Sequence, residues 1–209
     1  MAITLNGSGA NINPNKRGTI WVVDNFYEDP NAIRNWALEQ SYAEGGFGKG
    51  FMGYRSHEQF IVDGTKEAFE SIIGEKITQW TETHTICGRF QYCTADDKLV
   101  YHCDEQRYAA AVYLTPNAPY CSGTSLLAHK RTGMRHTYEQ NSNDVWVESA
   151  PTGSFTDGTQ WEEIDIVANV FNRLVIWDGH CPHAARNYFG FTKEQARLFH
   201  IFFFDTIPV

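Results

Sequence analysis

A His-x-Asp sequence, His102-Cys103-Asp104, is the first place in this chain where residue types and spacing suit metal chemistry. In an extended strand, residues two positions apart point to the same side, so the imidazole of His102 and the carboxylate of Asp104 can converge on one ion. A His-x-Asp sequence is frequent by chance. It predicts a metal centre only if a distant part of the chain supplies a third ligand.

A third ligand is expected in residues 172–187, NRLVIWDGHCPHAARN, where a predicted strand ends in a turn. We favour His183, because it follows Pro182, where the chain re-enters extended structure. His180 lies in the turn itself and is the alternative. Two histidines and one carboxylate form the facial triad of non-haem Fe(II) oxygenases, which leaves coordination positions open for other ligands.

Arg197 is a positively charged residue at the start of a predicted strand, the apolar sequence RLFHIFFFD. A buried arginine requires an anionic partner, because an unpaired buried charge is very costly. A dicarboxylate held by the two-pronged guanidinium would supply that partner. Pairing with a nearby Asp or Glu at the rim of a barrel is the alternative that the sequence leaves open.

This combination resembles the Fe(II)- and 2-oxoglutarate-dependent oxygenases, and within them the prolyl-hydroxylase-like group, including small members from phage genomes. The resemblance rests on the His-x-Asp sequence, on the distant Pro-His after a strand and on Arg197. It covers residues 19–205, including the segments WVVDNFYEDPNAIRNWAL and GRFQYCTADDKLVYHCDEQRYAAAVYLTPNAPYCSGTSLLAHKRTG.

The resemblance implies a role for each matching residue. His102, Asp104 and His183 would bind Fe(II), and Arg197 would bind the distal carboxylate of the co-substrate 2-oxoglutarate. Tyr113 would assist that carboxylate, because its position in this group carries a hydroxyl on the neighbouring strand.

Tyr92, ten residues before His102, matches a tyrosine that lines the co-substrate pocket. The alternative for Tyr92 and for Tyr113 is an ordinary half-buried aromatic residue of a strand. Related halogenases lack the carboxylate, so Asp104 implies hydroxylation rather than halogenation.

The implied activity is hydroxylation of an unactivated C–H bond in a peptidyl proline or related amino-acid substrate, coupled to conversion of O2 and 2-oxoglutarate into succinate and CO2. The primary substrate can be an amino acid, a peptide or a small molecule. Two other classes stay open: a non-catalytic jelly-roll module that binds a metal, and a capsid- or lectin-like sandwich without one. A structural zinc site would need a closed fourth ligand.

The elements that must position these residues indicate a mainly β fold, a double-stranded β-helix (jelly roll) with supporting N-terminal helices. Asp29-Pro30 and the apolar period after it predict a helix over 30–41, and a continuous apolar stripe predicts another over 65–82. Loops are predicted at the glycine-rich residues 45–53 and at residues 139–161. The predicted strands are 19–23, 86–93, 99–104, 107–114, 124–129, 145–148, 163–170, 173–178 and 197–205.

Domain organisation follows from the same patterns. Residues 1–18 have no period and are expected to form a flexible arm. Residues 19–209 are expected to form a single domain, with helical support over about 30–82 and a jelly-roll core over about 86–205.

Composition excludes several functions. The chain has 209 residues, 42% of them apolar, and a net charge of −8, which argues against nucleic-acid binding. No apolar run is long enough to cross a membrane, and the first residues lack the apolar core of a signal peptide. The five cysteines include no CxxC pair. We therefore expect a soluble cytoplasmic protein with reduced thiols, in a bacterial host if a phage encodes it.

Overall fold

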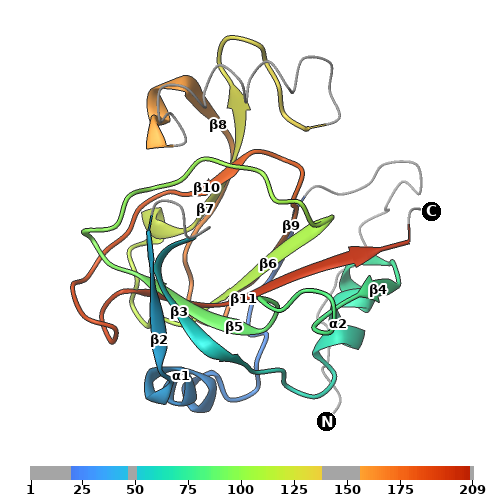
Figure 1. Ribbon diagram of the computed structural model, residues 1–209, viewed down its shortest axis with the longest axis vertical. Helices are drawn as coiled ribbons and strands as arrows, with labels where there is room; N and C mark the ends of the chain where they lie inside the picture. Colours follow the sequence, from blue (N-terminus) through green and yellow to red (C-terminus); the bar gives the residue numbers. More distant parts are fainter. Residues whose placement is uncertain (1–19, 47–50, 138–155, 208–209) are drawn as a thin grey trace.

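The computed structural model describes residues 20–46, 51–137 and 156–207. The predicted arm, residues 1–18, and the predicted strand 145–148 lie outside these ranges. The described chain is mainly antiparallel β-sheet with two α-helices, α1 (Pro30–Glu39) and α2 (Thr65–Ile73). This is the predicted double-stranded β-helix with helices near its N-terminus (Figure 1).

The strands form two sheets. The larger sheet has the order β1-β9-β6-β11-β5-β3-β2, with β4 paired to β11, and the smaller sheet has the order β10-β7-β8. Figure 1 shows the smaller sheet above the centre of the larger one. The strands are β1 (Ile20–Val23), β2 (Tyr42–Gly46), β3 (Phe51–Gln59), β4 (Ile77–Gln79), β5 (Arg89–Cys93), β6 (Tyr108–Tyr113), β7 (Thr124–His129), β8 (Trp161–Val167), β9 (Leu174–Asp178), β10 (His183–Ala185) and β11 (Arg197–Thr206).

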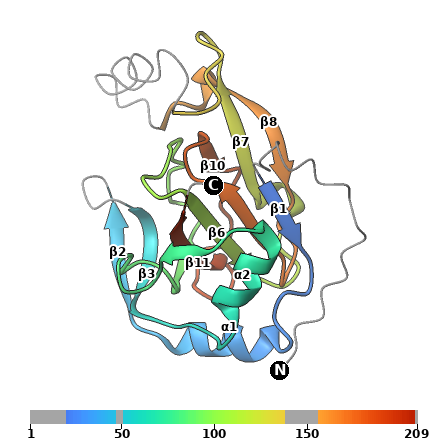
Figure 2. The ribbon, with the colours of Figure 1, turned by 90° about the vertical axis from the view of Figure 1, so that its right-hand side faces the viewer.

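The larger sheet has two different faces. Alternate residues of its central strands, such as Leu198 and Phe202 of β11, join the main hydrophobic core with Ala37 of α1 and Phe69 of α2. The helices thus cover this face (Figure 2). The residues between them, such as Phe199 of β11, point to the other face, toward the smaller sheet. The period of two along each strand therefore separates the core from the face that is left for a site.

Helix α1 begins as predicted. The Asp29 carboxylate accepts a hydrogen bond from the Ala32 N–H at 3.0 Å, and Pro30 occupies the first turn. The prediction of a second helix to residue 82 is wrong, because α2 ends at Ile73 and the next residue, Gly74, has a φ of +76° that terminates the helix. The apolar stripe continues into the core through Ile77 of β4.

The predicted loop over residues 45–53 is also wrong in part, because β2 and β3 occupy most of it. Gly53 has a φ of +74°, and a Cβ at this position would lie 2.4 Å from the carbonyl oxygen of Tyr92. The glycine therefore allows β3 to approach β5 closely, which no other residue type would permit.

The other predicted strands differ in smaller ways. Residues 124–129 form β7 with the predicted bounds, and 107–114, 173–178 and 197–205 match β6, β9 and β11 to within one residue at each end. Residues 99–104 form a single bridge at His102 instead of a strand. Residues 86–93 begin as a turn and become β5 only at Arg89, and residues 163–170 correspond to β8, which ends at Val167.

Neither helix of the described chain has the length and apolar character needed to cross a bilayer. All five cysteine thiols are free.

His200 is buried on the helical face of β11, opposite to Arg197. Its Nε2 donates to the carbonyl oxygens of Phe60 and Gly88 at 2.9 and 3.0 Å, so its Nδ1 accepts from the Tyr27 hydroxyl at 2.7 Å. Burial lowers the pKa of His200 to about 4 from 6.5.

This lowered pKa predicts a pH dependence of stability. An unfolded chain protonates His200 first as the pH falls, so its stabilising contribution is complete above pH 6.5 and is lost as the pH falls toward 4. The loss is at most about 1.4 kcal/mol per pH unit for one proton. His200→Gln should therefore show a shallower decline in the free energy of unfolding than the wild type, as measured by urea unfolding across this range. His57→Gln, at an exposed position of β3, is the control, and equal slopes for wild type and His200→Gln would contradict the account.

Candidate metal centre

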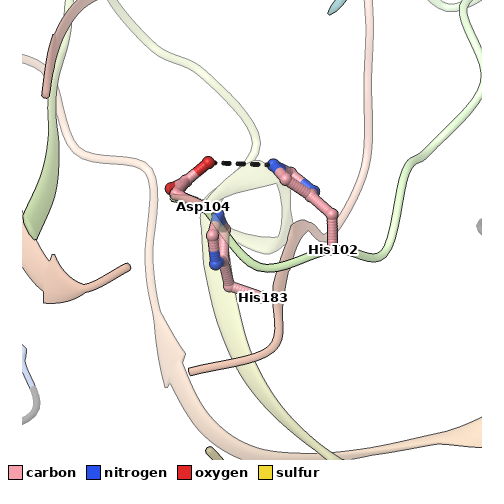
Figure 3. Close-up of side chains that lie close together, drawn as sticks. All are labelled: His102, Asp104 and His183. Atoms are coloured by element: carbon pink, nitrogen blue, oxygen red, sulfur yellow. Dashed lines mark ion pairs between the residues drawn. The ribbon is translucent and has the colours of Figure 1, made fainter. Parts of the chain in front are cut away.

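Three side chains from distant parts of the chain converge on one point. His102 and Asp104 lie in the segment between β5 and β6, and His183 begins β10. The main chains of the two histidines form a β-bridge. The distance from His102 N to His183 O is 3.1 Å, and that from His183 N to His102 O is 2.8 Å. One ligand atom from each of the three side chains lies within 4.8 Å of the others (Figure 3).

Hydrogen bonds determine which nitrogen of each histidine faces the centre. His102 Nδ1 lies 3.2 Å from the carbonyl oxygen of Val100. His183 Nδ1 lies 2.9 Å from the carbonyl oxygen of Cys181. Because a carbonyl oxygen only accepts, each Nδ1 must donate, and each Nε2 is left as the atom that can bind a metal. Metal-binding histidines have this arrangement in known sites.

Asp104 completes a set of donor atoms that suits a divalent metal. Its Oδ1 lies 3.6 Å from His102 Nε2, and its Oδ2 lies 3.3 Å from His183 Nε2. Oδ2 is buried and has no hydrogen-bond partner among the described residues. Such an atom is costly to bury unless a cation binds it. Two imidazoles and one carboxylate fit Fe(II), with room for further ligands.

Electrostatic interactions couple the three groups. Burial raises the pKa of Asp104. The nearby His183, His102 and Arg55 outweigh this effect and hold the pKa of Asp104 below its ordinary value. Burial, with contributions from His183 and Arg55, lowers the pKa of His102 to about 4, so this ring is neutral near pH 7. Although burial opposes it, Asp104 raises the pKa of His183. A metal ion that binds His183 Nε2 therefore competes with a proton at that atom.

The structure places His183, and not His180, beside His102 and Asp104. His180 lies in a second group with His136 and Asp178. Asp178 already forms a salt bridge to Arg107 at 2.7 Å and accepts the backbone N–H of His180 at 3.1 Å. A cation already neutralises this second carboxylate, which disfavours a metal there.

A cavity of about 710 Å³ opens beside the three residues. Its walls come from β3, β5, β6, β9 and β11 of the larger sheet and from β7 and β10 of the smaller one. The ring of Trp177 packs against that of His183, with centroids 5.1 Å apart, and also lines the cavity. This volume is in the range of about 300–1,000 Å³ that is typical of small-molecule sites.

Arg197 lies in the wall of this cavity and is only 4% exposed. Its Nε donates to the carbonyl oxygen of Ser122 at 2.7 Å. Its Nη2 donates to the carbonyl oxygen of Gly123 at 3.2 Å and to the Thr124 hydroxyl at 3.4 Å. Among the described residues no carboxylate lies within 4.0 Å of this guanidinium. The described residues therefore do not include the Asp or Glu partner at the rim that was the alternative for Arg197. Its positive charge is left for a ligand.

The two tyrosines lie in different places. Tyr113 is buried beside Arg197, whose Cζ lies 5.2 Å from the centroid of its ring, and its hydroxyl is 2.7 Å from that of Thr124. Burial raises the pKa of Tyr113, and the nearby Arg197 opposes this rise. Tyr92 points to the helical side of β5, where its ring stacks on that of Tyr54 with centroids 4.7 Å apart. The expectation that Tyr92 lines the cavity is therefore not met. Side chains alternate along β5, so Gln91 faces the cavity instead.

Two residues of the cavity wall were not predicted from the sequence. Arg55 comes from β3, in a part of the chain where no strand was expected. Tyr188 lies close to Arg197 and Cys93, and burial raises its pKa well above the usual value. The segment that contains Tyr188 has no period that could have indicated its position.

Comparison with known proteins identifies the sequence family of this chain. A family described as "Family of unknown function (DUF6445)" matches residues 10–188. The chain belongs to this family. No curated protein matches the chain.

Solved structures show the fold of this member of the family. HygX from Streptomyces hygroscopicus, with nickel and 2-oxoglutarate bound, has a TM-score of 0.58 at 10% identity, over 91% of this chain and 84% of that one. A prolyl hydroxylase from Trichoplax adhaerens, in complex with a peptide fragment of the hypoxia inducible factor oxygen degradation domain, has 0.54 at 13%, over 90% and 84%. The non-heme alpha ketoglutarate dependent carbocyclase SnoK from nogalamycin biosynthesis has 0.53 at 13%, over 90% and 80%.

Single substitutions separate the two candidate third ligands. We expect His183→Ala to raise the dissociation constant for Ni(II) by at least about ten-fold, since loss of even a residue that supports a ligand costs about 10- to 100-fold. His180→Ala should keep the affinity of the wild type. Isothermal titration calorimetry of each metal-free variant with Ni(II) measures both dissociation constants. The reverse order of affinities would assign the third ligand to His180.

Proposed function

We propose that this protein is an Fe(II)- and 2-oxoglutarate-dependent dioxygenase that hydroxylates an unactivated C–H bond. Its primary substrate is a peptidyl proline, a related amino acid or another small molecule. The observation that carries the proposal is the presence of two features in one cavity: the His102, Asp104 and His183 group, and a buried Arg197 without a carboxylate partner in the described chain.

The three candidate ligands would hold Fe(II) from one side. Two neutral imidazoles and one carboxylate leave open positions on the side of the cavity, where a chelating co-substrate and O2 can bind. When bound, Fe(II) supplies the activation of O2 that oxidises 2-oxoglutarate to succinate and CO2 and the substrate to its alcohol. HygX, solved with 2-oxoglutarate bound, and SnoK, an alpha ketoglutarate dependent carbocyclase, share this fold, which supports the class of reaction.

Arg197 would bind and orient the distal carboxylate of 2-oxoglutarate. Hydrogen bonds from its Nε and Nη2 to the chain at residues 122–124 fix the plane of the guanidinium and leave the N–H groups of Nη1 for a ligand. Tyr113 would hold the Thr124 hydroxyl in place through the 2.7 Å contact between their oxygens. Phe199 and Ile201 line the same cavity and would exclude water from the reacting groups.

Substitution of Arg197 tests the assignment of the co-substrate. Arg197→Met should raise the dissociation constant for 2-oxoglutarate by about ten-fold or more, because a hydrogen bond to a charged group contributes about 1.5–3 kcal/mol. The affinity for Ni(II) should stay at the wild-type value. Calorimetric titration of the Ni(II)-loaded protein with 2-oxoglutarate measures the effect. Arg173→Met, which removes an arginine paired with Asp24, is the matched control.

Turnover tests the enzymatic proposal itself. Under air, the Fe(II)-loaded wild type should convert 2-oxoglutarate to succinate, slowly without the primary substrate and faster with it. Asp104→Ala should abolish this conversion, since it removes the only carboxylate of the candidate ligand set. Succinate is measured by NMR, and formation at the wild-type rate in Asp104→Ala would rule out the assigned metal centre.

A further inference from the structure

A second guanidinium faces the same cavity. Arg55 of β3 is 9% exposed and lines the wall. Its Nε donates to the side-chain oxygen of Gln91 at 2.8 Å, and its Cζ lies 4.1 Å from the centroid of the Phe51 ring. Its two terminal nitrogens have no hydrogen-bond partner among the described residues, and no described carboxylate lies within 4.0 Å. The contacts through Nε and the ring fix the plane of the guanidinium and leave its outer edge for a ligand.

The register of the sheet places Arg55 and Arg197 on the same face. Arg55 pairs with Gln91 between β3 and β5, and Arg197 pairs with Cys93 between β5 and β11. Gln91 and Cys93 are two residues apart on β5, so they point to the same side. Both guanidiniums therefore project from one sheet face into one cavity, with a single strand between the strands that carry them.

Arg55 is a buried charge whose burial is offset only in part. Cys93 and Asp104 favour its charged form, but Asp104 is also the carboxylate of the candidate metal centre. Burial, followed by the nearby Arg89, lowers the pKa of Arg55 itself to about 10. A guanidinium so placed is a charge without an adequate counter-charge, and a bound anion would correct this.

The charges of the proposed complex do not balance without another anion. Fe(II) and Arg197 carry three positive charges, and Asp104 and 2-oxoglutarate carry three negative ones. Arg55 adds a positive charge that nothing in this set neutralises. Glu105, a further acidic residue in the wall, is exposed to solvent. What the cavity lacks is therefore one negative charge beside Arg55.

We propose that Arg55 binds a carboxylate of the primary substrate, and that the substrate is therefore an organic acid such as a free amino acid. A carboxylate carries the single charge required and matches the planar fork of a guanidinium. Arg55 is then the residue that determines this specificity, and Gln91 and Phe51 position it. The inference rests on the proposed function for the ligand that occupies Arg197.

A pair of matched probes tests this assignment without knowledge of the natural substrate. N-acetylglycine carries a carboxylate, and N-acetylglycinamide has the same shape without the charge. Each is titrated into Zn(II)-loaded protein that is saturated with 2-oxoglutarate, and the ¹⁵N resonance of Arg55 Nε is followed by NMR. The resonance is identified by its disappearance in Arg55→Lys. We expect a saturable shift with N-acetylglycine and none with N-acetylglycinamide.

Variants show whether the carboxylate binds at Arg55. Arg55→Met should raise the dissociation constant for N-acetylglycine by about ten-fold or more while the affinity for 2-oxoglutarate stays unchanged. Arg55→Lys keeps the charge but loses the fork, so an intermediate loss is expected even if Arg55→Met does not fold. Arg173→Met is the matched control, because it removes an arginine that pairs with Asp24 and does not line the cavity.

Three results would overturn the inference. They are equal shifts with both probes, no shift of the Arg55 resonance by N-acetylglycine, or a loss of 2-oxoglutarate affinity in Arg55→Met as large as that in Arg197→Met. The last result would assign Arg55 to the co-substrate. If the wild type does not bind 2-oxoglutarate at all, the proposed function fails. If it binds 2-oxoglutarate but N-acetylglycine does not shift the Arg55 resonance, only the assignment of Arg55 is contradicted.

Discussion

The main-chain bridge between His102 and His183 is the constraint on which the candidate site depends. The reciprocal hydrogen bonds bring together two segments that are far apart in the sequence. Each imidazole then donates its Nδ1 proton to a carbonyl oxygen within its own segment, so both Nε2 atoms meet the carboxylate of Asp104. The cost of burying Asp104 Oδ2 without a hydrogen-bond donor is the physical reason to expect a cation there. The local backbone thus fixes the geometry of the candidate metal centre before any ligand binds.

The second constraint is the period of two in the strands of the larger sheet. On β11 it directs Leu198, His200 and Phe202 into the core beneath the helices and Arg197 and Phe199 into the cavity. One face is therefore stabilised by apolar burial, and the other can hold charges that a folded core would not tolerate. A fold does not by itself determine a function, so the function of this chain has to be argued from the residues of this face.

Local sequence patterns were sufficient for the parts of the structure that depend on local geometry. The His-x-Asp spacing predicted that His102 and Asp104 lie together, which they do although residues 99–104 form a bridge and not the predicted strand. The capping residue Asp29 located the start of α1. Patterns failed where contacts between strands decided the outcome. The glycine-rich pattern around Gly53 predicts a loop, because the role of this glycine, the close approach of β3 to β5, exists only in the folded sheet. Arg55 was missed for the same reason, since only strand pairing brings β3 to the cavity.

The most direct test of the account is an anaerobic titration of 2-oxoglutarate into the Fe(II)-loaded wild-type protein, followed by visible absorption. The account predicts a saturable charge-transfer band, because chelation requires both the open positions left by His102, Asp104 and His183 and the carboxylate site at Arg197. The band needs no knowledge of the primary substrate. Its absence from protein that demonstrably holds one Fe(II) would contradict the oxygenase assignment and favour a jelly-roll module that binds a metal without this co-substrate.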